Sequence, residues 1–118
     1  MPRAHEELIK QLLAELTPDE TNNGVVYVTA QPIAAGTEIK LPRLTINVEA
    51  DSLLAFVDRE PAANWTHSCR YLLINCATGA TRSFEAQLPP FGQQAQTGAW
   101  RVAYKAPAVP DALLAVPQ

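Results

Sequence analysis

The sequence predicts a mostly β fold with one N-terminal α-helix and about seven short, mainly antiparallel strands in a sandwich-like arrangement. Three observations predict it. Apolar residues recur with helical spacing only near the N-terminus, and beyond residue 24 the apolar period changes to two. Turn-forming residues then separate the apolar runs at short intervals. The chain has 118 residues, so we expect residues 1–118 to form a single domain.

Residues 3–16 carry the one clear helical pattern. Pro2 suits a helix start and Pro18 suits a stop just beyond the last apolar residue. The apolar positions form a single stripe, which we expect to pack against the sheet that follows. The stripe consists of Leu8, Ile9, Leu12, Leu13 and Leu16. Residues 17–24, with the sequence TPDETNNG, predict a turn throughout.

The β domain is predicted to span residues 25–105. We expect strands within residues 25–31, 34–41, 44–49, 53–58, 69–75, 82–88 and 99–105. Pro61 marks a loop over 59–64, and the charges at 58–60 predict a solvated turn. Residues 88–98 predict a second loop. Residues 106–118 form a Pro/Ala-rich tail. The sequence is compatible with two conformations of this tail, an extended strap and a mobile end.

The fifth and sixth runs predict a β-hairpin. A two-residue turn at Thr78-Gly79 places glycine where a positive φ is required. Pairing outward from that turn sets Leu73 opposite Phe84, and directly opposed residues share a face of the sheet. The 69–75 run is apolar on both faces, so it predicts a central strand covered on each side.

Composition and charge exclude several classes of partner. The net charge is -3 and the basic residues form no run, which argues against a nucleic-acid partner. No stretch approaches the ~20 apolar residues of a membrane span. Charges interrupt the first sixteen residues, unlike the apolar core of a signal peptide. We therefore expect a cytoplasmic protein with no membrane partner.

The two cysteines, Cys69 and Cys76, are predicted to be unbonded. In one extended strand, residues seven apart lie roughly 23 Å apart at ~3.3 Å per residue and point to opposite faces. A disulfide requires Cα atoms within about 7 Å. Two reduced thiols fit a reducing compartment.

Residues 64–71, NWTHSCRY, concentrate rare residue types. On a strand, His67 and Cys69 share a face but lie too far apart for direct contact, so we expect no catalytic pair. The other possible metal ligands, His5 and Cys76, provide no second close pair, so we expect no metal or other cofactor. The stretch is interpreted first as an aromatic core anchor leading into a central strand.

Residues 71–87, YLLINCATGATRSFEAQ, resemble the hairpin of PepSY-type domains. The features shared are an aromatic–aliphatic strand, a Thr-Gly turn and a second strand. The resemblance implies an inhibitory propeptide or protease-associated module, although the secretion signal usual in that family is absent from this sequence.

The function predicted first is that of a small acidic, non-enzymatic protein-interaction or accessory domain, because no catalytic constellation is visible. Its partner would be another protein, including a second copy of the chain. The candidate binding residues are Asn64, Trp65, His67, Arg70 and Phe91. One alternative is a protease inhibitor that inserts the 59–64 or 88–94 loop into a protease cleft. The other is an enzyme or metal protein built on His67 and Cys69.

Overall fold

The computed structural model describes residues 3–63, 67–91 and 97–116. In these ranges the chain forms a five-stranded sheet of order β6-β5-β4-β1-β7 and a two-stranded sheet, β2-β3. All of the pairings are antiparallel. The elements are α1 (His5–Ala14), α2 (Pro18–Asn23), β1 (Val25–Thr29), β2 (Glu38–Leu41), β3 (Leu44–Asn47), β4 (Ser52–Asp58), β5 (Cys69–Asn75), β6 (Thr81–Ala86), β7 (Trp100–Lys105) and the 3-10 helix η2 (Asp111–Leu113). The mostly β prediction is confirmed.

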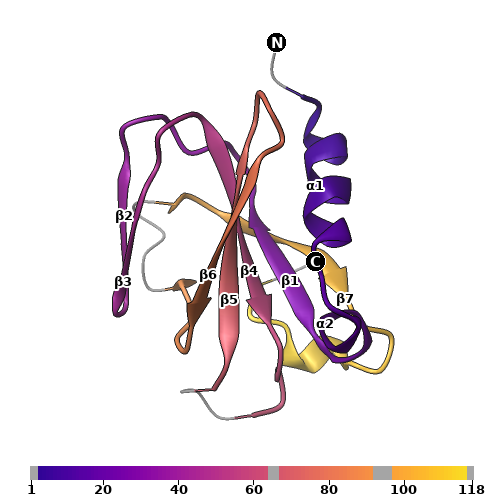
Figure 1. Ribbon diagram of the computed structural model, residues 1–118. Coiled ribbons are helices and arrows are strands. Elements are labelled where there is room, and N and C mark those ends of the chain that lie inside the picture. Colours follow the sequence, from indigo (N-terminus) through magenta and orange to yellow (C-terminus); the bar gives the residue numbers. More distant parts are fainter. Residues whose placement is uncertain (1–2, 64–66, 92–96, 117–118) are drawn as a thin grey trace.

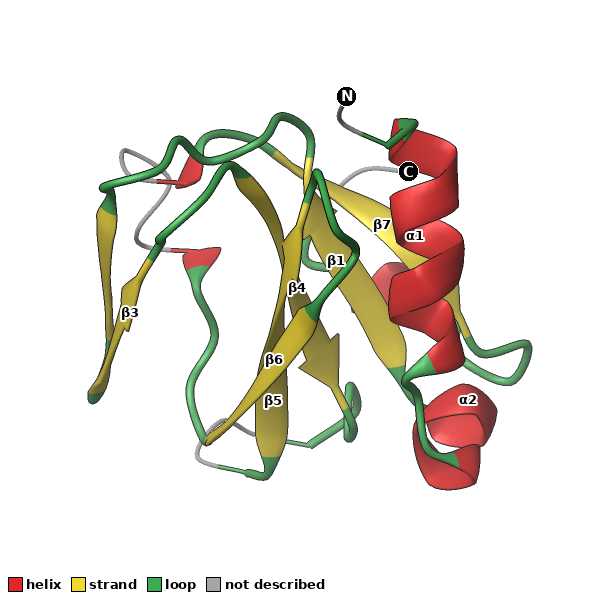
Figure 2. Cartoon of the chain, turned by 45° about the horizontal axis from the view of Figure 1, so that its top comes forward, coloured by secondary structure: helices red, strands yellow, loops and turns green. Residues whose placement is uncertain are grey.

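The molecule has three layers, with the five-stranded sheet in the middle. Helix α1 lies on one face of this sheet, and the β2-β3 hairpin lies on the other (Figures 1 and 2). Two apolar clusters fill the spaces between the layers. The α1 side buries Leu8, Leu12, Val26, Val28, Leu53, Ala55, Val57, Leu72, Ile74 and Cys76. The hairpin side is aromatic and includes Tyr27, Phe56, Tyr71 and Trp100.

The predicted helix stripe does pack on the sheet. Leu8 and Leu12 are buried, and the other three apolar positions of the stripe are partly buried against the same cluster. The helix is shorter than residues 3–16, because Ala4 is extended and Glu15 caps the C-terminal end. Within the described ranges, no helix is long and apolar enough to cross a membrane.

The turn predicted for residues 17–24 is wrong, since Pro18–Asn23 form helix α2. A capping box begins this helix. The Thr17 hydroxyl accepts a hydrogen bond from the Glu20 backbone N–H at 3.2 Å, and Glu20 Oε1 accepts one from the Thr17 N–H at 2.9 Å. Thr-Pro-Asp-Glu matches the capping-box pattern and has proline in the first turn, where its missing N–H costs nothing.

The hairpin prediction has the right faces and the wrong register. Leu73 pairs with Arg82 and Tyr71 with Phe84, a displacement of two residues that keeps every side chain on its face. The Asn75 side chain causes the difference. Its Oδ1 accepts hydrogen bonds from the N–H groups of Ala77 and Thr78 and holds a longer loop over residues 76–79.

Strand β5 is covered on both faces, as predicted, and lies between β4 and β6. The C-terminal segment of residues 106–116 is docked. The Ala106 N–H donates to the Gly24 carbonyl at 3.0 Å, and the Ala115 N–H donates to the Tyr27 hydroxyl at 2.9 Å. We call this docked segment the C-terminal strap, and it contains the 3-10 helix η2.

Gly24 joins α2 to β1 at a close approach of two backbones. A Cβ at this position would lie 2.7 Å from the Glu20 carbonyl oxygen and 2.9 Å from that of Asp58. We therefore expect Gly24→Ala to lower the free energy of unfolding by about 1–3 kcal/mol in urea denaturation, the usual cost of overpacking. Gly36→Ala is the comparison, because a Cβ there meets nothing and only its positive φ of 89° imposes a cost. Wild-type stability for Gly24→Ala would contradict this close approach.

Candidate functional site

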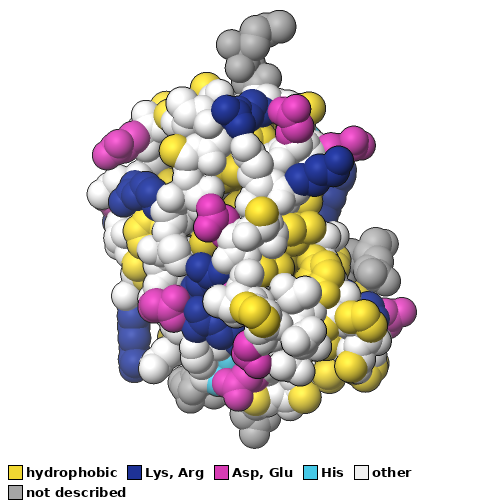
Figure 3. Space-filling view, turned by 45° about the vertical axis from the view of Figure 1, so that its right-hand side comes forward, with side chains coloured by type: hydrophobic (Ala, Val, Ile, Leu, Met, Phe, Trp, Pro, Cys, Tyr) yellow, Lys and Arg dark blue, Asp and Glu magenta, His cyan; other side chains and the backbone are white. Residues whose placement is uncertain are grey.

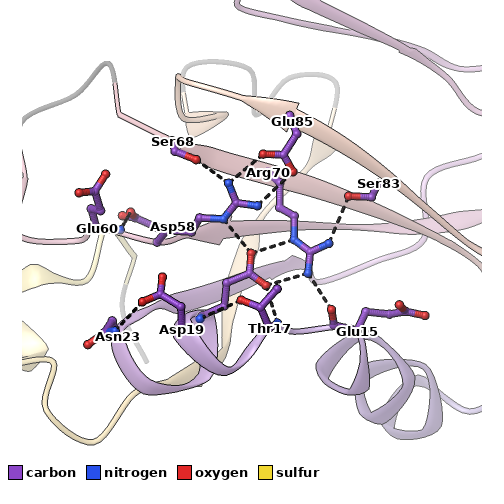
Figure 4. Close-up of polar contacts among 12 residues, drawn as sticks. Glu15, Thr17, Asp19, Asn23, Asp58, Glu60, Ser68, Arg70, Ser83 and Glu85 are labelled. Carbon is purple, nitrogen blue, oxygen red and sulfur yellow. Dashed lines mark hydrogen bonds and ion pairs between the residues drawn. The ribbon is translucent and has the colours of Figure 1, made fainter.

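A buried carboxylate, that of Glu20, lies between two arginine side chains at one end of the sheet. Figure 4 shows the polar contacts of this region, with Thr17, Arg70 and Glu85 among the labelled residues. Its Oε2 accepts hydrogen bonds from Arg59 Nε at 2.8 Å and Arg70 Nε at 2.9 Å. Its Oε1 accepts one from Arg70 Nη2 at 2.7 Å, besides the capping bond from Thr17. A fully buried carboxylate is thus neutralised by two guanidinium groups, which is how proteins accommodate such a charge.

The two arginines extend this contact to four elements of the fold. Arg59, just after β4, forms a fork to both carboxylate oxygens of Glu85 on β6, at 2.8 and 3.0 Å, and also donates to Ser68. Arg70, on β5, donates to the Ser83 hydroxyl at 3.2 Å and to the Glu15 carbonyl at 2.7 Å. We call Glu20, Arg59, Arg70 and Glu85 the ion network. It ties α2, the β4-β5 loop, β5 and β6 together. The solvated turn predicted at 58–60 holds for Glu60, which is exposed, but not for Asp58, which is buried, or Arg59, which is bound to two carboxylates.

The network controls the protonation of its acids. Burial by itself raises the pKa of Glu20, but hydrogen bonds from Arg70, Thr17 and Arg59 together bring that pKa below its ordinary value of 4.5. The fork from Arg59 likewise lowers the pKa of Glu85. The same fork, with the bond to Glu20, raises the pKa of Arg59, so Glu20, Glu85 and Arg59 are charged at neutral pH.

His67 lies beside the ion network, before the start of β5. Its Nε2 is 3.6 Å from Asp58 Oδ1 and its Nδ1 is 3.8 Å from Glu60 Oε2, with only 8% of the side chain exposed. Burial raises the pKa of Asp58, partly offset by its hydrogen bond from Glu60 N–H and by His67. Because β5 begins at Cys69, the strand face predicted to be shared by His67 and Cys69 is not formed.

The two thiols lie in the apolar clusters on opposite faces of the sheet. Cys69 belongs to the aromatic cluster, and burial raises its pKa to about 12. Cys76 lies under α1, and burial raises its pKa too. Both are unbonded. In the part of the chain that the structure describes, no three His, Cys, Asp or Glu side chains gather closely enough to hold a metal ion.

Of the other predicted binding residues, one belongs to this site, one is separated from it and two lie outside the described ranges. Arg70 belongs to the ion network, whereas Phe91 points into the aromatic cluster. The Phe91 ring meets Tyr27, Phe56 and Trp100 edge-on, with centroids 5.1 to 5.9 Å apart. Asn64 and Trp65 lie outside the described residues.

An apolar groove lies next to the ion network, between the β4-β5 loop and the C-terminal strap. Its volume is about 350 Å³. We call it the loop-end groove, and its lining consists of Asn23, Arg59, Glu60, Pro61, Ala62, Ala63, Ala108, Val109, Pro110 and Leu113. On this side of the molecule, acidic and basic side chains lie against one another beside hydrophobic ones (Figure 3). Arg59 therefore links the groove directly to the network.

Three residues of the network were missed from the sequence: Glu20, Arg59 and Glu85. The capping-box pattern of Thr17 to Glu20 is a detectable signal for the helix that positions Glu20. No local signal identifies the partners, since Glu20 is 39 residues from Arg59 and 50 from Arg70 in the chain.

Comparison of the chain with protein-family models, with curated proteins and with solved structures found no match to any of them. The resemblance of residues 71–87 to a PepSY hairpin therefore rests on those residues alone.

Glu20→Gln should lower the free energy of unfolding by about 3 kcal/mol, because it leaves Arg70 without its carboxylate partner and Arg59 with Glu85 alone. Glu85→Gln is the matched control. Glu85 is largely exposed, so we expect a loss below about 1 kcal/mol. Urea denaturation at pH 7 measures both losses, and equal losses would contradict the central role of Glu20.

The same variants predict the acid dependence. A carboxylate whose folded pKa is lowered stabilises fully above its unfolded pKa, near 4.5, and loses this contribution as pH falls through the lower folded value. Below about pH 4.5 the wild type should therefore lose stability more steeply than Glu20→Gln does. Parallel curves would refute the lowered pKa of Glu20.

The buried thiols should be inert in the native protein, because the thiolate is the reacting form and burial disfavours it. A chromogenic disulfide reagent at pH 8 should react with both cysteines in denaturant without reductant and only slowly in native buffer. The absence of free thiol in denaturant, or rapid reaction of the native protein, would contradict this prediction.

Proposed function

We propose that this protein is a small acidic, non-enzymatic interaction domain of the cytoplasm that binds another protein at the loop-end groove. One observation carries the proposal: the groove has an apolar lining with a charged rim, and its walls come from the β4-β5 loop and the C-terminal strap. Protein-binding surfaces share this arrangement of an apolar centre and a polar border.

The composition of the groove supports a polypeptide as its occupant. Proline, alanine and valine form most of its lining, and Leu113 is 37% exposed, which makes it the large hydrophobic residue most open to solvent among those described. A leucine at the edge of a groove, surrounded by small side chains, offers the kind of apolar contact that anchors a partner.

The geometry also supports a rigid surface. Arg59 lines the groove and is bonded to Glu20 and Glu85, so the base of the β4-β5 loop is held by charge-assisted hydrogen bonds. A groove ordered before binding costs less conformational entropy when the partner docks. The buried thiols argue for binding rather than thiol chemistry, because the raised pKa values leave them protonated.

Site-specific photo-crosslinking in the native host tests the proposal. A photoreactive amino acid in place of Ala62, in the groove, should crosslink a protein that the same group at Thr45, exposed on β3, does not. Leu113→Asp should weaken binding of that protein by about 10-fold, since a buried apolar anchor contributes on the order of 1–2 kcal/mol. Identical crosslinks at both positions, or none at Ala62, would contradict the proposal.

The identity of the crosslinked protein separates the predicted roles. A protease that loses activity on binding would make the interaction inhibitory, as the alternative prediction has it. A partner with no protease activity supports the accessory role.

A further inference from the structure

Strand β6 forms one edge of the five-stranded sheet, opposite the β7 edge (Figure 1). Its backbone directions follow from the hairpin, because the Asn75 N–H donates to the Ala80 carbonyl. Backbone groups alternate in direction along an antiparallel strand. Those of Thr81, Ser83 and Glu85 therefore point away from β5, toward the position that a sixth strand would occupy.

This edge is open along the part of the chain that the structure describes. No backbone hydrogen bond reaches Thr81, Ser83 or Glu85 from outside the hairpin in residues 3–63, 67–91 and 97–116. The strand carries two charged side chains, Arg82 and Glu85, but it lacks two other features that block an edge. It has no proline and its ladder with β5 has no register shift, whereas the ladder of β7 is irregular at Val26/Tyr27.

Two cationic side chains on the hairpin side flank this edge. Arg82, at the start of β6, stacks over the Phe84 ring at 5.0 Å, and Arg43 lies in the β2-β3 turn beyond the end of β6. Among the described residues, neither guanidinium has a carboxylate within ion-pair distance, although Arg82 shares a small cavity with Glu49. The acid of the edge, Glu85, is already bound by Arg59.

A cavity continues the edge at its C-terminal end. It has a volume of about 390 Å³ and lies between the β2-β3 turn and the end of β6. Arg43 and Leu44 line it on one side, and Ala86 and Leu88 on the other. A strand added to β6 would therefore place a side chain in this cavity, next to Arg43.

We propose that the β6 edge binds an extended, acidic segment of another polypeptide by β-strand addition. The backbone groups of Thr81, Ser83 and Glu85 pair with the segment, and acidic side chains on one face of it approach Arg82 and Arg43. Strand addition of this kind takes affinity from backbone hydrogen bonds and selectivity from pockets for alternate side chains. The surface is separate from the loop-end groove, so this inference goes beyond the proposed function.

Charge favours an acidic segment over a second copy of the chain. Residues two apart on a strand share a face, so alternating acids in the segment lie along the side that carries both arginines. A second β6 edge would instead bring its own Arg82 and Arg43 to this side and set like charges near one another.

The test uses a capped, fluorescent hexapeptide of alternating valine and glutamate, titrated against the full chain. Ser83→Pro removes the outward N–H of β6 without touching the ladder to β5, where the N–H of Arg82 is used instead. Ser83→Ala is its matched control, because both variants lose the Ser83 hydroxyl that accepts from Arg70 but only the proline loses the N–H.

We expect wild type and Ser83→Ala to bind the peptide, with shifts of the Thr81, Ser83 and Glu85 amide signals in wild-type NMR spectra. Ser83→Pro should lose at least about 5-fold in affinity, the value of one lost hydrogen bond. Equal binding by Ser83→Pro and Ser83→Ala would overturn the proposal, as would the absence of peptide binding. If Ser83→Pro does not fold, the wild type is titrated instead with a peptide that is N-methylated on alternate backbone nitrogens and so lacks those N–H donors. Binding of this peptide as tight as that of the unmethylated peptide would overturn the proposal.

A second titration tests the charge preference by comparing the affinity of the valine–glutamate peptide with that of a peptide of alternating valine and glutamine. Glutamine peptides, and the Arg43→Gln variant with the glutamate peptide, should each bind about 2–5-fold more weakly, as expected for an exposed ion pair. Equal affinity for both peptides would overturn the acidic preference.

Leu113→Asp, in the loop-end groove, should leave peptide binding unchanged. Failure of the β6-edge proposal and failure of the groove proposal can therefore be told apart. Concentration-dependent dimers in light scattering, lost in Ser83→Pro, would overturn the proposal in favour of a second copy.

Discussion

The buried carboxylate of Glu20 is the constraint on which the loop end of this molecule depends. A carboxylate with no exposed surface is costly unless every lone pair finds a donor, and Glu20 is surrounded by donors from Thr17, Arg59 and Arg70. Each donor comes from a different element. Satisfying this one charge therefore places the start of α2, the base of the β4-β5 loop and the start of β5 relative to one another.

The rest of the sheet is held by apolar packing on both faces. Helix α1 covers one face with a leucine stripe, and the β2-β3 hairpin and the strap cover the other over an aromatic cluster. Phe91, which the sequence offers as a candidate binding residue, lies in that cluster together with Trp100. Their rings fix the ends of the β6-β7 connection to the core.

Both faces of the sheet are covered, and the two surfaces for which we propose partners are an end and an edge of it. The loop-end groove is apolar and has Arg59 of the ion network in its lining, whereas the β6 edge offers backbone groups with two arginines on its hairpin side. The two surfaces favour different features of a partner. In our proposals the first takes a compact apolar contact and the second an extended acidic chain.

Local pattern by itself determined the helix stripe, the seven strand positions and the faces of the hairpin, because side-chain periodicity of 3.6 or 2 is set by backbone geometry within a few residues. The hairpin register could not be predicted from periodicity alone. The hydrogen bonds of one side chain, Asn75, displaced the turn without changing which side chains lie on which face of the sheet. Helix α2 was readable from its capping box. The tertiary structure alone decided the partners of Glu20, the groove between loop and strap, and which strand lies at the edge. These depend on contacts between residues tens of positions apart, which leave no period in the sequence.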